Sequence, residues 1–130
     1  MAVIDIVEKL LKQAGIKYTR DQNALTLRWK TDHFDDLKVK ITTNNDDSWL
    51  YVVAPFTSIN EVDEGVKAKF LYDMLKESWK ANGVKYVIDK DEDIIVIAET
   101  NDTDLTAEEV QTLVNHVVHA CDVLWEIYPS

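Results

Sequence analysis

The sequence is poor in the residues that build several common kinds of functional site. It has one cysteine, Cys121, so no disulfide can form within the chain and a cysteine-rich zinc site is excluded. With 3 glycines and 2 prolines, it has little material for a phosphate-binding loop or a flexible linker. The P-loop, GxGxxG and GxSxG patterns are absent. Nothing in the sequence marks a catalytic residue, and we expect the protein not to be an enzyme.

Positive charge is also scarce. The chain has 14 lysines and arginines against 24 acidic residues, and its formal net charge is −10 at pH 7. Nucleic acids and anionic membranes are bound through cations that replace counterions, so neither is an expected partner. The two arginines, Arg20 and Arg28, are too few for an arginine-rich patch. The acidity supports solubility, and it would also favour a basic partner.

Long apolar runs are missing as well. No segment approaches the ~20 apolar residues needed to cross a bilayer. Charged residues interrupt the apolar start, 1–9, so a signal-peptide core is not expected and the protein is expected to be cytoplasmic. Hydrophobic residues make up 46% of the 130 residues, as in an ordinary globular domain. We therefore expect residues 1–130 to form a single domain.

Hydrophobic periodicity predicts the elements of the first half. Apolar residues recur at steps of three and four over 3–14, which indicates an amphipathic helix that ends at Gly15. Apolar and polar residues alternate over 25–30 and 37–42, so two strands follow. A polar turn leads to a third strand, Trp49 to Ala54, which we expect Pro55 to end. Short connections favour an antiparallel meander.

The second half alternates between helix and strand. A helix is predicted over 61–82, with Leu71, Met74, Leu75 and Ser78 on one face and Ala68, Tyr72 and Trp79 along its border. Strands 84–88 and 94–99 flank an acidic turn. Thr106 and Glu109 form a capping box that begins a helix reaching about Tyr128, whose apolar seam is Val110, Val114, Val117, Cys121, Leu124 and Tyr128. The order α-β-β-β-α-β-β-α predicts an α+β fold with a five-stranded antiparallel sheet packed against helices.

The second half also resembles a known family. The segments 70–75, 82–89 and 93–99, followed by a helix that starts LTAEEV at Leu105, are similar to the YbjN family, whose members share their fold with the type III secretion chaperones. These segments are packing and turn patterns rather than catalytic motifs. The resemblance implies an α+β fold that is often dimeric, and binding to other proteins rather than catalysis. It brings no catalytic residues.

Two groups of residues could suggest a metal site. Asp89, Asp91 and Asp93 alternate as in a calcium loop, but the sixth and twelfth positions of that loop would be Ile94 and Thr100 instead of glycine and glutamate. We therefore expect a solvated hairpin turn.

Two histidines on the last helix, His116 and His119, stand three residues apart, but Cys121 belongs to the apolar seam and His119 points roughly opposite to it. We expect a partly buried His116, an exposed His119, a core Cys121, and no metal or other cofactor.

The aromatic residues are the most suggestive feature. Trp49 and Tyr51 share one face of the third strand with Val53, and the strand 94–97 is apolar on both faces. Helices on only one side of the sheet would leave part of this surface exposed for binding, whereas a helix on each side would make all of it core. Trp79 and Trp125 border the apolar faces of their helices, as rim residues or as interface anchors.

These observations favour a non-enzymatic, chaperone-like module that presents apolar sheet or helix surface to a protein partner or to itself, as a homodimer. The expected partner-binding residues are Trp49, Tyr51, Trp79 and Trp125. The alternative is a small enzyme or small-molecule-binding protein with a pocket between sheet and helices, lined by polar groups such as His116 or Tyr86. A third possibility is a structural subunit whose apolar face is used in self-association.

Overall fold

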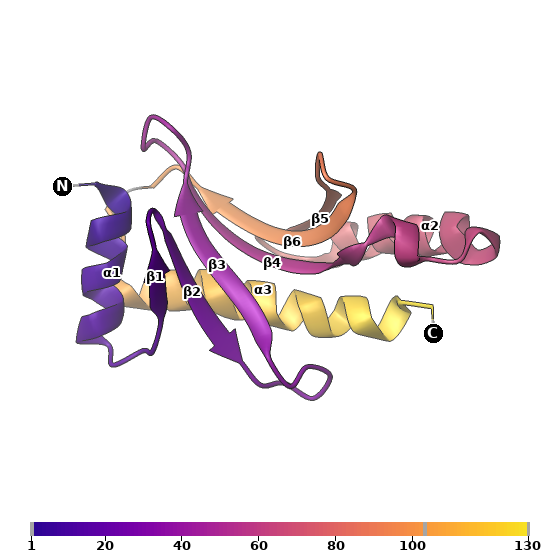
Figure 1. Cartoon of the computed structure of the whole chain (residues 1–130), viewed down its shortest axis with the longest axis horizontal. Helices are drawn as coiled ribbons and strands as arrows, with labels where there is room; N and C mark the ends of the chain where they lie inside the picture. The colour runs from indigo at the N-terminus through magenta and orange to yellow at the C-terminus, as the bar shows by residue number, and fades with distance from the viewer. Residues whose placement is uncertain (1, 103, 130) are drawn as a thin grey trace.

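The computed structural model describes residues 2–102 and 104–129. In this part of the chain, three α-helices accompany a six-stranded antiparallel sheet with the strand order β1-β2-β3-β4-β6-β5 (Figure 1). The elements are α1 (Val3–Gln13), β1 (Thr19–Asp21), β2 (Ala24–Trp29), β3 (Leu37–Thr43), β4 (Leu50–Ser58), a 3-10 turn (Ile59–Glu61), α2 (Glu64–Lys80), β5 (Lys85–Ile88), β6 (Asp93–Thr100) and α3 (Ala107–Ile127). The α+β class and the antiparallel sheet are confirmed.

The core lies between one face of the sheet and the helices α1 and α3. Along β3, every second residue is buried and the lysines between them are exposed, as the period of a strand requires. α3 runs across the sheet behind β2 and β3, and α1 packs beside it (Figure 1). The apolar seam predicted for α3 is buried from Val110 to Leu124, and the capping box of Thr106 and Glu109 is present. The predicted last helix is therefore confirmed.

The prediction of five strands is wrong, because the sequence signal for β1 is absent. All three residues of β1 are exposed, and Thr19, Arg20 and Asp21 show no apolar alternation. The strand is held by backbone pairing to β2, and Arg20 also forms ion pairs of 2.7 Å with Asp5 and Glu8 of α1. Backbone pairing leaves no hydrophobic pattern, so β1 could be found only from the three-dimensional arrangement.

The prediction that Pro55 ends the third strand is also wrong. β4 continues through Pro55 to Ser58, with a bulge between Pro55 and Thr57. Proline lacks the N–H that a central strand needs. Val53 is the last residue of β4 paired with β3, so Pro55 has a partner strand only on the β6 side. Proline therefore removes no hydrogen bond from the β3 side of the sheet.

The outer face of the sheet has no helix packed on it in residues 2–102 and 104–129. Of the two predicted arrangements, the structure therefore has the one with helices on only one side of the sheet. The helices contact the inner face or one another: α1 contacts β2 and β3, α3 contacts β3, β4 and β6, and α2 contacts α3 and β5. Leu50, Val52 and Ala54 of β4 point inward and are fully buried, whereas Tyr51 and Val53 point outward and are half-buried. The sheet therefore exposes apolar side chains on its outer face.

Candidate protein-binding surfaces

The largest exposed hydrophobic residues lie on α2. Asp63 caps this helix by accepting a hydrogen bond from Gly65 N–H, and the helix extends beyond β4 at one end of the molecule (Figure 1). Phe70 and Met74 are buried and fix one side of α2 against the core. The spacing of three and four residues places Tyr72, Leu75 and Trp79 together on another side. They are 62%, 68% and 87% exposed, and we call them the α2 stripe.

The α2 stripe corrects the predicted faces of this helix. Leu75 was expected beside Met74 on the packed face, but it points to solvent, and Phe70 with Met74 forms the buried face. The apolar residues of α2 therefore occupy more of the circumference than one packing face requires. The wide distribution of apolar residues around α2 is the sequence signal that could have indicated a second apolar face.

A second surface is the centre of the outer sheet face. Cross-strand pairing places Val53 opposite Ile97, and both Pro55 and Val87 opposite Ile95. The isoleucines and valines are only half-buried, since no helix covers them. Lys40 and Lys85 are the outer neighbours of this row. The surface is thus an apolar strip bordered by lysines.

A third surface surrounds Trp125 near the end of α3. His33, Phe34 and Phe56 contact its ring, with ring centres 6.0, 5.5 and 6.5 Å away. The ring of Tyr128 lies 5.2 Å from that of Phe56. Trp125 remains 47% exposed. We call these five residues the Trp125 cluster. The sequence predicts only Trp125 as a binding residue and places Tyr128 in the apolar seam of the last helix.

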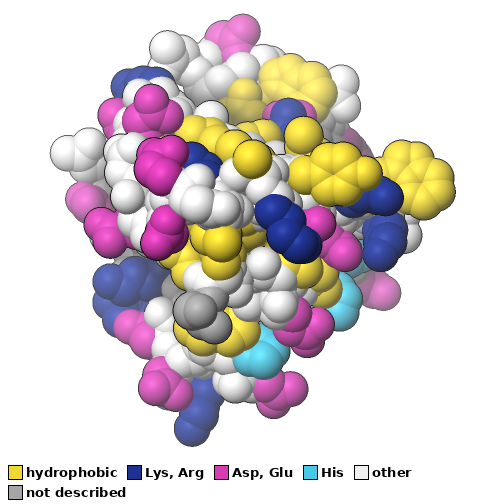
Figure 2. All heavy atoms as spheres, turned by 90° about the vertical axis from the view of Figure 1, so that its right-hand side faces the viewer, with side chains coloured by type: hydrophobic (Ala, Val, Ile, Leu, Met, Phe, Trp, Pro, Cys, Tyr) yellow, Lys and Arg dark blue, Asp and Glu magenta, His cyan; other side chains and the backbone are white. Residues whose placement is uncertain are grey.

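The four predicted partner-binding residues do not form one site. Trp79 lies on α2 and Trp125 near the end of α3, whereas Tyr51 lies near the start of β4 on its outward side and Trp49 directly precedes this strand. Trp49 is 37% exposed and Tyr51 is half-buried. Figure 2, which looks at the end of the molecule from the right-hand side of Figure 1, shows large hydrophobic side chains at the surface with basic side chains beside them and acidic side chains elsewhere on this face.

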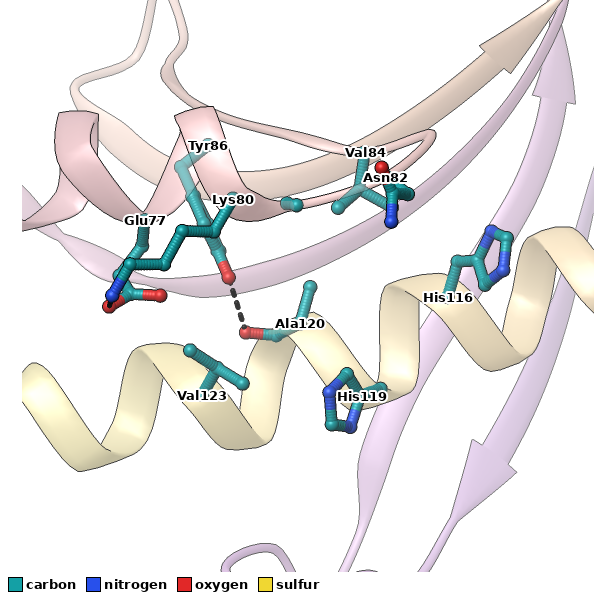
Figure 3. Close-up of a pocket in the computed structure, with 10 residues that line it drawn as sticks. Glu77, Lys80, Asn82, Val84, Tyr86, His116, His119, Ala120 and Val123 are labelled. Atoms are coloured by element: carbon teal, nitrogen blue, oxygen red, sulfur yellow. Dashed lines mark hydrogen bonds and ion pairs between the residues drawn. The ribbon is translucent and has the colours of Figure 1, made fainter.

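The predicted alternative site, between sheet and helices, corresponds to a cleft of about 290 Å³. Tyr86 and His116 both line it, but the Tyr86 hydroxyl already donates a hydrogen bond of 3.0 Å to the Ala120 carbonyl. Lys80 lies 3.4 Å from Glu77. Figure 3 shows the imidazole rings of His116 and His119 pointing in different directions. Tyr86 and Lys80 are therefore paired and the two imidazoles point apart, so these polar groups do not gather on one point.

The acidic turn predicted between β5 and β6 uses the carboxylate of Asp89 for hydrogen bonds within the turn. The Asp89 side chain accepts hydrogen bonds from the backbone N–H groups of Asp91 and Asp93, and Glu92 has a φ of 66°. This is the hydrogen bonding of a tight hairpin turn. Within the described ranges, no three His, Cys, Asp or Glu residues lie where they could hold a metal ion together.

The two histidines of α3 are both exposed, so the partial burial expected for His116 is wrong. His116 lies over Gly83: a Cβ atom at position 83 would be 3.3 Å from the Nδ1 atom of His116. A glycine at this turn leaves the imidazole uncovered. Gly83 has a φ of 75°, as glycine readily adopts.

Among the described helices, none is long and apolar enough to span a bilayer.

The core position expected for Cys121 is confirmed, and it predicts an inert thiol. Burial raises the pKa of Cys121 to about 12, because the thiolate is poorly solvated inside the protein. At pH 8 we expect the native protein to react with a disulfide reagent roughly a thousandfold more slowly than an exposed thiol of pKa ~8.5. Unfolding in guanidinium should restore full reactivity. Rapid labelling of the native protein would contradict the buried position.

Comparison with known proteins finds no matching family model and no match among curated proteins. Solved structures do match over nearly the whole chain. The ExsC–ExsE complex matches with a TM-score of 0.69 at 14% identity, covering 99% of this chain and 98% of that chain. The Yersinia pestis type III secretion chaperone SycH, in complex with a fragment of YscM2, matches with a TM-score of 0.63 at 15% identity, covering 95% and 99%.

YbjN from E. coli matches with a TM-score of 0.69 at 18% identity, covering 95% of this chain and 89% of that chain. At such identities, the similarity concerns the fold. The resemblance drawn from the residues of the second half is confirmed at that level and extends to the first half. The chain has the fold of the type III secretion chaperones and of YbjN.

Proposed function

We propose that the protein is a non-enzymatic, chaperone-like module that binds another protein and that works as a cytoplasmic homodimer. The observation that carries this proposal is the α2 stripe, three large hydrophobic side chains that are each more than half exposed. A contiguous exposed apolar surface of this kind marks an interaction site. The structural neighbours named as chaperones in complex with partners support the same role.

The charge of α2 argues that the stripe meets a second copy of the chain. The whole chain has a net charge of −10, so two copies repel one another over most of their surface. α2 differs, because its 17 residues contain four lysines and three acidic residues. Two α2 helices can therefore approach each other without net acidic repulsion. In a two-fold dimer each stripe would meet its own copy, so each residue would contribute twice.

The remaining predicted residues lie outside this surface and are proposed to contact the protein partner. Trp49 and Tyr51 lie at one end of the outer sheet face, and Trp125 lies at the centre of its aromatic cluster. Both surfaces are built by other elements than the α2 stripe, and the Trp125 cluster meets α2 on the side opposite to the stripe, where Tyr128 packs on Phe70. A dimer joined through α2 would leave them free for a partner.

Sedimentation equilibrium of the purified chain tests this proposal. Over ~1–100 µM protein we expect twice the mass of the chain to dominate, and the dimer should persist in 0.5 M salt because apolar contacts are not screened. A monomer mass throughout this range would refute self-association. A dimer that falls apart when salt is added would show that ion pairs rather than the α2 stripe hold the copies together.

A further inference from the structure

The Trp125 cluster combines exposed aromatic rings with negative charge. The loop 30–36 and the last turns of α3, which carry three of its five members, also carry five carboxylates and one lysine. The carboxylates belong to Asp32, Asp35, Asp36, Asp122 and Glu126. Asp36 is paired with Arg28 and the Glu126 carboxylate lies 3.6 Å from His33 Nε2, but Asp32 and Asp35 are exposed and make no ion pair with the described residues. The rim of this apolar surface is therefore acidic.

The loop is held in place before any partner arrives. The Thr31 hydroxyl donates a hydrogen bond of 2.8 Å to Asp122 of α3, and it accepts hydrogen bonds from the backbone N–H groups of His33 and Phe34. Thr31 N–H donates to the Phe34 carbonyl at 2.8 Å. One hydrogen bond thus ties the loop to the helix, and three more fix the turn within the loop. A surface ordered in advance loses little conformational entropy on binding.

The ring of Trp125 is held in one orientation yet remains available. His33 stacks on it with an angle of 19° between the planes, and Phe34 meets it edge-on at 70°. Almost half of the residue still faces solvent. Tryptophan in such a setting is the residue type that most often dominates the free energy of a protein contact. The cluster is therefore suited to receive an apolar side chain.

We propose that the Trp125 cluster is the docking site for a basic segment of a partner protein, one that presents an apolar side chain between lysines or arginines. The apolar side chain packs on Trp125 and Phe34, and the flanking cations pair with Asp32, Asp35 and Glu126. This inference deepens the proposed function and rests on its protein-binding part, but it does not require self-association. An acidic segment would meet like charges around the same rings.

The probe is a fluorescein-labelled peptide of 12 residues that has leucine at every fourth position and lysine at all others. Its binding to the protein is measured by fluorescence anisotropy. We expect Trp125→Ala to weaken its binding at least 10-fold. The double variant Asp32→Asn, Asp35→Asn should weaken binding about 3- to 10-fold at low salt. The matched control Asp91→Asn, Glu92→Gln removes the same charge from the exposed hairpin turn and should leave binding unchanged.

Equal loss of binding in the control double variant would overturn the proposal, because it would show attraction to the net charge alone. Equal or tighter binding of a peptide with glutamate in place of lysine would overturn it as well. If Trp125→Ala fails to fold, comparison of the two double variants still tests whether the peptide binds at the Trp125 cluster. Sedimentation of Trp125→Ala should give the same mass as the unchanged chain. Loss of a dimer in this variant would instead assign the cluster to self-association.

Discussion

Replacing Leu75 with glutamate is expected to convert the proposed dimer into a monomer. Leu75 is 68% exposed at the centre of the α2 stripe, between Tyr72 and Trp79. In a two-fold interface the substitution places two carboxylates, one from each copy, in the same apolar contact. We expect the dissociation constant to rise at least 100-fold. Trp79→Ala, which removes a ring from each copy without adding charge, should raise it about 30-fold, as for two symmetry-related side chains that contribute ~1 kcal/mol each.

The matched control is Gln13→Glu, which adds the same charge at an exposed position of α1. It should leave the dimer intact. Sedimentation of the three variants at equal concentration, with circular dichroism to confirm folding, distinguishes a local contact from a general effect of charge. A Leu75→Glu protein that remains as dimeric as Gln13→Glu would place the interface elsewhere.

Replacing Phe70 with alanine is expected to have the largest effect on stability. Phe70 is 2% exposed, and its ring lies 5.3 Å from that of Tyr128 on the far side of α2 from the stripe. Removing a buried phenylalanine side chain costs about 3–5 kcal/mol, since apolar contacts are lost and a cavity remains. The measurement is urea denaturation in the Leu75→Glu background, because dimerisation would add a concentration-dependent contribution to the free energy of unfolding.

The control for this second prediction is Tyr72→Ala in the same background. Tyr72 is 62% exposed on the same helix, so its removal should change the free energy of unfolding by no more than about 0.5 kcal/mol. Similar losses for Phe70→Ala and Tyr72→Ala would mean that both sides of α2 are packed in the monomer. The exposed stripe would then be absent.

The sequence predicts those parts of the fold in which local pattern and tertiary contacts agree. The steps of four and three from Val110 to Leu124 place one side of α3 in the core, and the Thr106 capping box marks where the helix begins. Gly15 ends α1 with a φ of 71°. The alternation in β2 and β3 identifies strands because one face is buried and the other is exposed.

The remaining features depend on contacts between distant segments. β1 exists because its backbone pairs with β2, and Pro55 is tolerated because the pairing of β4 with β3 stops at Val53. The Trp125 cluster joins Phe34, Phe56 and Trp125 from three separate parts of the chain. Their meeting follows from the path of the loop over α3, which no local pattern encodes. For the same reason, periodicity alone could not assign Leu75 to solvent.

The central claim is that the α2 stripe becomes buried when two copies associate. It is tested most directly by fluorine NMR of the chain labelled with 5-fluorotryptophan, with the resonance of Trp79 assigned from Trp79→Phe. Trp79 is 87% exposed in the single chain, so its solvent isotope shift should be large in the monomeric Leu75→Glu variant and nearly lost in the dimer of the unchanged chain. A Trp79 resonance that keeps its full isotope shift in a sample shown to be dimeric would contradict the claim.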